Sequence, residues 1–185
     1  MEPSFPAPSA FEQFLLPHLE SAYNFARWLL RHEHDAEDAV QEACVRAHRA
    51  LPRFRSGDGR GWLLTIVRNV CYSRLRQTRG AEAPETFDDE VHGVDDAPAE
   101  LAALEWKEDR LAQLRAGVER LPPEFREVLV LHELEGLRYR DIAEVAGIPL
   151  GTVMSRLARA RRKLQADLLR TGHGAPGHEE PTHGL

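Results

Sequence analysis

Hydroxyl and arginine side chains near the C-terminal end of the chain have the chemistry to bind DNA. They belong to the stretch AGIPLGTVMSRLARARRKL, residues 146–164, which carries five basic residues and no acid. Arginine pairs with phosphates and guanine edges, and hydroxyls bond to either. The residues that would share one exposed helix face are Thr152, Ser155, Arg156, Arg159 and Arg162. The alternative is a helical hairpin whose basic face is only solvated.

The spacing around this stretch predicts a helix-turn-helix. Ile142 and Ala143 would lie on a short first helix, and Gly147 follows where the turn favours a left-handed backbone. The residues that would hold the second helix against the core are Ile148, Val153 and Leu157. In this motif the second helix enters the DNA major groove.

A second set of side chains, in the first half of the chain, is typical of single-strand binding. Phe54 and Trp62 alternate with arginines along one stretch. Aromatic rings stack on exposed bases while arginines follow the backbone, and the loop 51–60 could hold a flipped base. The arginines of this set are Arg53, Arg55, Arg60, Arg68, Arg74 and Arg76. A core position for Trp62 with solvated arginines is the alternative.

Apolar periodicity predicts the helices that must position these residues. We expect one helix over 11–32, a second from an Asp35 cap to Leu51, and a third from about Trp62 to Gln77. Another resumes near Glu100, and Pro122 and Pro123 separate it from the next. The predicted fold is all-α, with two small helical domains joined by a flexible acidic linker, the C-terminal one a helix-turn-helix. The expected boundaries are a disordered tail 1–10, a domain 11–79, the linker 80–104, a domain 105–170 and a disordered tail 171–185.

Charge is distributed unevenly along the 185 residues, whose formal net charge is −6. Residues 45–79 carry nine basic residues and one acid, whereas residues 80–109 carry one basic residue and 11 acids. Residues 110–170 again carry an excess of four positive charges. Two basic patches around an acidic connector indicate a polyanionic partner contacted at two places.

Other classes of protein fit the sequence less well. The sequence predicts a cytoplasmic protein without membrane insertion. It has only two cysteines, its N-terminus is unlike a secretion signal, and it contains no long apolar run. None of the nine histidines matches a helical metal pair, and no nucleophile motif occurs, so we expect no enzyme, no cofactor and no structural metal. The histidines of the C-terminal tail would bind metal at most weakly. A stand-alone helix-turn-helix regulator is the main rival, although no heptad or ligand domain accompanies the motif.

Two longer stretches resemble a known family. The motifs DAEDAVQEACVRAHRAL and FRSGDGRGWLLTIVRNVCYSRLRQ are similar to the second conserved region of bacterial sigma factors. The stretch LPPEFREVLVLHELEGLRYRDIAEVAGIPLGTVMSRLARARRKL is similar to their fourth region. The order of the two, with no domain between, resembles the extracytoplasmic-function (ECF) group. The resemblance covers about residues 11–79 and 105–168.

The resemblance implies roles for particular residues. The helix matching residues 35–51 would dock on the clamp helices of the largest subunit of RNA polymerase, and the fourth region on the flap. The implied clamp contacts are Asp38, Gln41, Glu42 and Arg46. The loop 51–60 and the next helix, including Asn69, would read and open the promoter −10 element, and the basic helix would read the −35 element. An anti-sigma factor is a further implied partner. Met154 stands where many members have Lys or Arg, so no consensus promoter can be copied from a relative.

Overall fold

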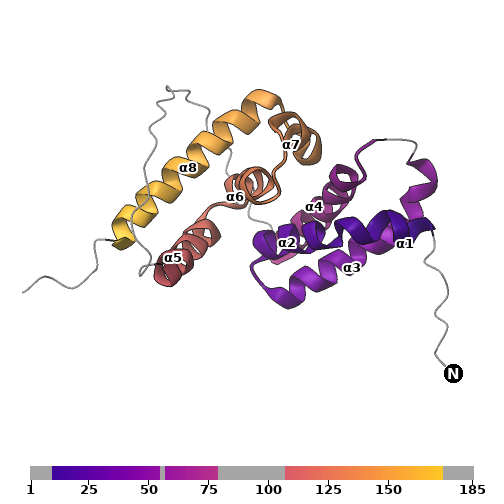
Figure 1. Cartoon of the computed structure of the whole chain (residues 1–185), viewed down its shortest axis with the longest axis horizontal. Helices are drawn as coiled ribbons and strands as arrows, with labels where there is room; N and C mark the ends of the chain where they lie inside the picture. The colour runs from indigo at the N-terminus through magenta and orange to yellow at the C-terminus, as the bar shows by residue number, and fades with distance from the viewer. Residues whose placement is uncertain (1–9, 55–56, 79–106, 173–185) are drawn as a thin grey trace, which may run out of the picture.

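The structure, a computed structural model, describes residues 10–54, 57–78 and 107–172. Every regular element in these ranges is helical, which confirms the predicted all-α class. The helices form a first unit, residues 10–78, and a second unit, residues 107–172 (Figure 1). The predicted linker and most of the two predicted tails lie outside the described residues, although Ala10 begins α1 and α8 continues to Gly172.

The first unit packs three longer helices around an apolar core. Its elements are α1 (Ala10–Leu15), η1 (Leu16–His18), α2 (Leu19–Leu30), α3 (Glu33–Ala50), η2 (Leu51–Arg53) and α4 (Gly59–Thr78). Helix α3 presents a stripe of fully buried alanines, Ala36, Ala39, Ala43 and Ala47. Small side chains allow α2 and α4 to approach α3 closely, and Phe25, Leu29 and Leu63 fill the space between them.

One predicted helix of the first unit is interrupted and two begin at other residues than predicted, each for a local reason. The helix expected over 11–32 is interrupted by the 3-10 turn Leu16–His18, which contains Pro17. Helix α3 begins at Glu33 after an extended His32, so Asp35 lies inside the first turn and is not the cap. The third helix begins at Gly59, because the Asp58 carboxylate accepts hydrogen bonds from the backbone N–H groups of Arg60 and Gly61, both at 3.0 Å.

The second unit carries the turn that the sequence predicted. Its elements are α5 (Lys107–Arg120), α6 (Pro123–Leu129), the π-helical turn η4 (Val130–Leu134), α7 (Tyr139–Ala146) and α8 (Leu150–Gly172). Pro122 occupies the N-cap position of α6 without a side-chain cap, and Pro123 is in the first turn, so the two prolines separate α5 from α6 as predicted. The long helix α8 packs along both α5 and α6, and Arg120 of α5 forms an ion pair with Asp167 of α8. The start expected near Glu100 falls outside the described residues.

The two units are in contact with each other. Helix α4 packs against α7, and α2 packs against α6 and η4 (Figure 1). No pattern in the sequence predicted this interface. It matters for function because two residues expected to bind DNA lie at it.

Candidate nucleic-acid interface

The turn between α7 and α8 has the geometry of a helix-turn-helix. Gly147 ends α7 with φ 65° and ψ 37°, in the left-handed region that favours glycine. The Ile148 N–H then donates to the Ala143 carbonyl at 3.1 Å, which closes the turn. Val153 and Leu157 are buried and Ile148 is partly buried against the core, as predicted. Ile142 of α7 is buried in the same core, which α7 and α8 therefore share.

The opposite side of α8 carries the predicted DNA-reading residues. Thr152, Ser155, Arg156 and Arg159 are half-buried, and Arg162 is exposed. The Ser155 hydroxyl donates to the Thr152 carbonyl at 3.1 Å, and Arg162 Nε donates to the Ala158 carbonyl at 3.4 Å. Met154 is 54% exposed, which leaves an apolar side chain beside this basic face. A helix with this face fits a groove in which phosphates flank base edges.

The predicted aromatic residues of the first unit form one cluster. Phe14, Phe54 and Trp62 are half-buried, and their ring centroids lie 5.0 to 5.8 Å apart. Trp62 also packs against the apolar core, so it combines the core position with a partly exposed ring. Asn69 and Arg76 lie exposed on α4, whereas Arg55 is outside the described residues.

Two of the predicted single-strand arginines bind carboxylates of the second unit. The Arg60 guanidinium pairs with Glu135 and donates through Nε to the Ser21 hydroxyl at 3.0 Å. The Arg68 guanidinium pairs with Glu127 and lies 4.5 Å from the centroid of the Tyr72 ring. In this arrangement Arg60 and Arg68 therefore face the second unit rather than an open surface.

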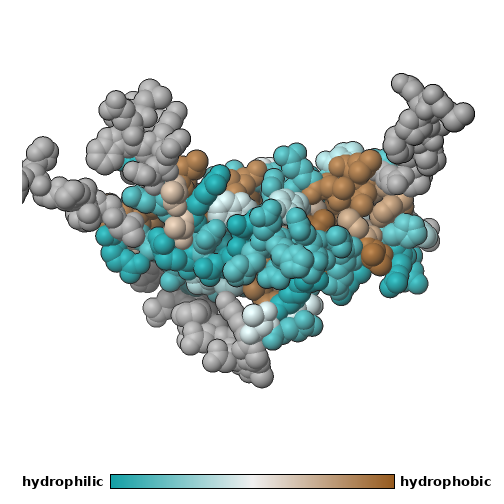
Figure 2. Space-filling view, turned by 90° about the horizontal axis from the view of Figure 1, so that it is seen from below, coloured by the Kyte–Doolittle hydropathy of each residue, from teal (hydrophilic) through white to brown (hydrophobic). Residues whose placement is uncertain are grey.

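The helix α3 carries the residues expected to contact polymerase. Glu42 pairs with Arg46 four residues later and also with Arg74 of α4 at 3.3 Å, and Asp38 lies 3.7 Å from Arg74. Gln41 and Arg46 are exposed. Val45, which sequence reasoning missed, is 51% exposed between them, and an apolar area is visible over the first unit in Figure 2.

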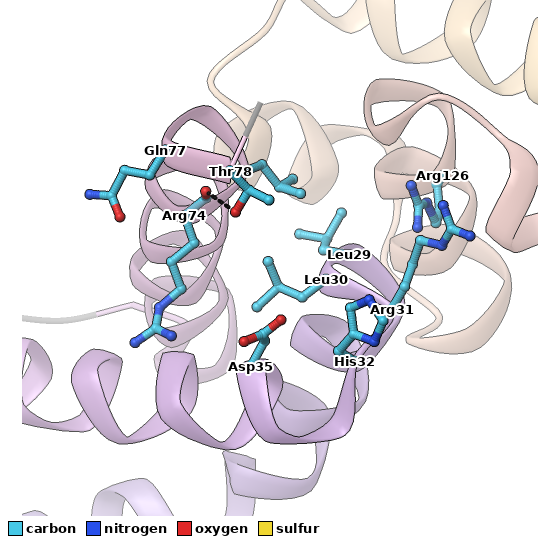
Figure 3. A pocket seen from close by; sticks show the side chains of 10 residues that line it. Leu29, Leu30, Arg31, His32, Asp35, Arg74, Gln77, Thr78 and Arg126 are labelled. Carbon is cyan, nitrogen blue, oxygen red and sulfur yellow. Dashed lines mark hydrogen bonds between the residues drawn. The ribbon is translucent and has the colours of Figure 1, made fainter. Parts of the chain in front are cut away.

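A cavity of about 450 Å³ lies where α2, α3 and α4 meet α6. It is lined by basic side chains from both units, among them Arg31, Arg74 and Arg126. Figure 3 shows Arg31 and Arg126 on one side and Arg74 on the other, with Asp35 between them. These cations do not converge on one point, so the cavity is a gap at the junction rather than a site for a single ligand. Within the described ranges, no cluster of His, Cys, Asp or Glu could hold a metal, and no helix could cross a membrane.

The interface residue that sequence reasoning missed is Glu127. It lies in α6 with no exposed surface, and its neighbour Arg126 is only 3% exposed. Burial raises the pKa of Glu127, whereas hydrogen bonds from Arg68 and Tyr72 act in the opposite direction. The available signal was the run FREVLVL, in which a charged pair interrupts a segment that is otherwise apolar.

Comparison with known proteins matches each unit to a family. The family model of sigma-70 region 2 matches residues 14–81, and the model of sigma-70 region 4 matches residues 111–164. The chain is 36% identical over 156 residues to the ECF RNA polymerase sigma factor SigM of Mycobacterium tuberculosis, covering 84% of this chain and 75% of that protein. It is 34% identical over 160 residues to the ECF sigma factor SigE of Mycolicibacterium smegmatis, covering 84% of this chain but 60% of that protein.

Two solved structures share the fold. One is the sigma factor RpoE in complex with the anti-sigma factor NepR from Bartonella quintana, which is 32% identical with a TM-score of 0.65, covering 86% of this chain and 96% of that one. The other is CnrH in complex with the cytosolic domain of CnrY, 28% identical with a TM-score of 0.61, covering 88% of each chain.

Proposed function

The chain belongs to the sigma-70 family of RNA polymerase sigma factors, in its ECF group, and from this premise we propose that it directs core RNA polymerase to specific promoters. The observation that carries the proposal is the presence of both sigma regions in order on one chain, the second with a helix-turn-helix. In this role the protein reads the −35 and −10 elements and helps to open the duplex.

We assign reading of the −35 element to the start of α8. Thr152, Ser155 and Arg156 follow the Gly147 turn directly, where a helix that enters the major groove meets base edges. Arg159 and Arg162 lie one and two turns further along, where they meet phosphates. The net positive charge of residues 110–170 supports this assignment.

Opening and reading of the −10 element is assigned to the first unit. Phe54 and Trp62 offer partly exposed rings on which an unpaired base can stack. The cationic and polar side chains that would follow the strand are Arg55, Arg60, Arg68, Asn69, Arg74 and Arg76. Arg60 and Arg68 can act in this way only when they are released from the second unit.

Polymerase binding is assigned to the face of α3 formed by Asp38, Gln41, Glu42 and Arg46, together with the exposed Val45. An apolar side chain surrounded by charges is the usual composition of a specific protein interface. One solved relative is a complex with an anti-sigma factor, which supports the same class of partner here. As a partner of polymerase the protein would act in the cytoplasm and would need no reaction chemistry of its own.

Gel shifts on labelled genomic fragments test the proposal, using the chain alone, core polymerase alone and both together. We expect sequence-specific complexes only when chain and core are combined. Specific complexes with the chain alone would indicate a stand-alone regulator instead. For the docking face, Arg46→Glu should weaken binding to core in the absence of DNA, whereas Arg162→Glu, on the opposite unit, should leave it unchanged.

A further inference from the structure

The interface between the two units contains a charged group that depends on the other unit. Glu127 of α6 is fully buried, and the hydrogen bonds to its carboxylate come from α4. Arg68 Nε donates to one oxygen, while Arg68 Nη2 at 3.4 Å and the Tyr72 hydroxyl at 2.8 Å donate to the other. A buried carboxylate is costly unless it is paired and hydrogen-bonded, so docking of α4 supplies what Glu127 needs.

Two further polar contacts join the units around this pair. Arg60 at the start of α4 pairs with Glu135, whose side chain is 6% exposed, directly after η4. Arg126, the neighbour of Glu127, donates through Nη1 to the Trp28 carbonyl of α2 at 3.0 Å. The contacts therefore extend from α2 to both halves of α4, and they hold the second unit in one orientation.

The same contacts occupy residues that the first unit needs for DNA. Arg60 and Arg68 are two of the arginines assigned to the −10 strand. A guanidinium whose charge is paired with a carboxylate and whose surface is largely covered by the other unit is a weaker partner for a phosphate. The carboxylates that the second unit presents to α4 thus compete with the promoter phosphates for these two arginines.

We propose that Glu127 and Glu135 form an intramolecular lock, in which the second unit occupies Arg60 and Arg68 and keeps the first unit from binding single-stranded promoter DNA. This inference rests on the proposed sigma-factor function. Undocking then precedes promoter opening, and any partner that binds the two units apart from each other releases the arginines. The docked form is the resting state of the free chain.

The test uses the full chain and three variants. Glu127→Gln with Glu135→Gln removes the lock and keeps side-chain shape. Glu133→Gln with Glu144→Gln changes net charge equally, but both of these side chains are exposed on the second unit, and Glu133 pairs with Arg161 of the same unit. Tyr72→Phe keeps every charge and removes one hydrogen bond to Glu127. Circular dichroism shows that each variant keeps its helices, and small-angle X-ray scattering measures whether the units separate.

Binding is measured by fluorescence anisotropy with a labelled random-sequence single strand of about 12 nucleotides, a length typical of single-strand sites. We expect the Glu127/Glu135 variant to bind about tenfold more tightly than the Glu133/Glu144 variant, within the 5–150-fold range of couplings between sites. A plot of log affinity against log salt concentration should also become steeper, its slope more negative by about 1.4, because two released arginines each neutralise one phosphate of the single strand. Tyr72→Phe should fall between wild type and the double variant.

Equal binding by the two double variants would overturn the lock, as would a Glu127/Glu135 variant whose radius of gyration stays at the wild-type value. Failure of the lock is distinguishable from failure of the proposed function. Promoter-specific transcription by the wild-type chain with core polymerase supports the function whatever the variants do.

Discussion

Replacement of Gly147 by alanine isolates the backbone contribution to the helix-turn-helix. Gly147 has φ 65°, and a Cβ placed there would meet no atom within 4 Å. Packing therefore contributes nothing to the change, and the left-handed conformation alone costs about 1–2 kcal/mol for a residue with a Cβ. Loss of unfolded-state freedom offsets about 0.4–1 kcal/mol of this cost. The expected net loss of folding free energy is about 1 kcal/mol.

Gly151 provides the matched control, because it also has open space around its Cβ position but lies inside α8 without a positive φ. Gly151→Ala should stabilise the protein by about 0.5–1 kcal/mol, since alanine is the better helix former. Equilibrium urea unfolding of the full chain, followed by circular dichroism, measures both variants. The two substitutions should shift the free energy of unfolding in opposite directions. If Gly147→Ala is no more destabilising than Gly151→Ala, the left-handed turn and the helix-turn-helix derived from it are wrong.

Three further predictions concern DNA. Arg156→Ala should reduce promoter use by about 1–3 kcal/mol in a manner that depends on the −35 sequence, measured by competitive transcription; an equal loss on all upstream sequences would show phosphate contact only. Met154, 54% exposed on α8, should contact thymine methyl groups of the −35 element. In gel shifts with core polymerase, replacing these thymines by deoxyuridine should weaken promoter binding by the wild type more than binding by Met154→Ala; equal weakening would exclude the contact. Phe54→Ala should slow strand opening, and premelted templates should restore transcription; no restoration would point to disruption of the cluster with Phe14 and Trp62.

The sequence predicted the parts of the fold that depend on local patterns. Apolar periodicity located the helices, and the Ala143-to-Gly147 spacing located the turn, because both reflect the backbone geometry of a few neighbouring residues. Helix starts were less predictable, since Asp58 caps α4 through bonds that only the folded loop reveals.

The contact between the units could not be predicted in the same way. Glu127 is separated from Arg68 by 59 residues, and a glutamate in α6 is as compatible with an exposed face as with a buried pair. Its burial depends on the docking of the two units. The apolar periodicity of each unit is accounted for by its own core, so it gives no sign that the other unit docks. For the same reason, composition placed Arg60 and Arg68 in a basic stretch of the sequence but could not predict their partners in the structure.

We propose above all that this chain confers promoter specificity on RNA polymerase. The most direct test is transcription in vitro from a genomic fragment library by core polymerase, with and without the protein, followed by mapping of RNA 5′ ends. We predict start sites that appear only with the protein and share two upstream sequence elements at a fixed spacing. Start sites that are unchanged by the protein, or that share no upstream elements, would contradict the account.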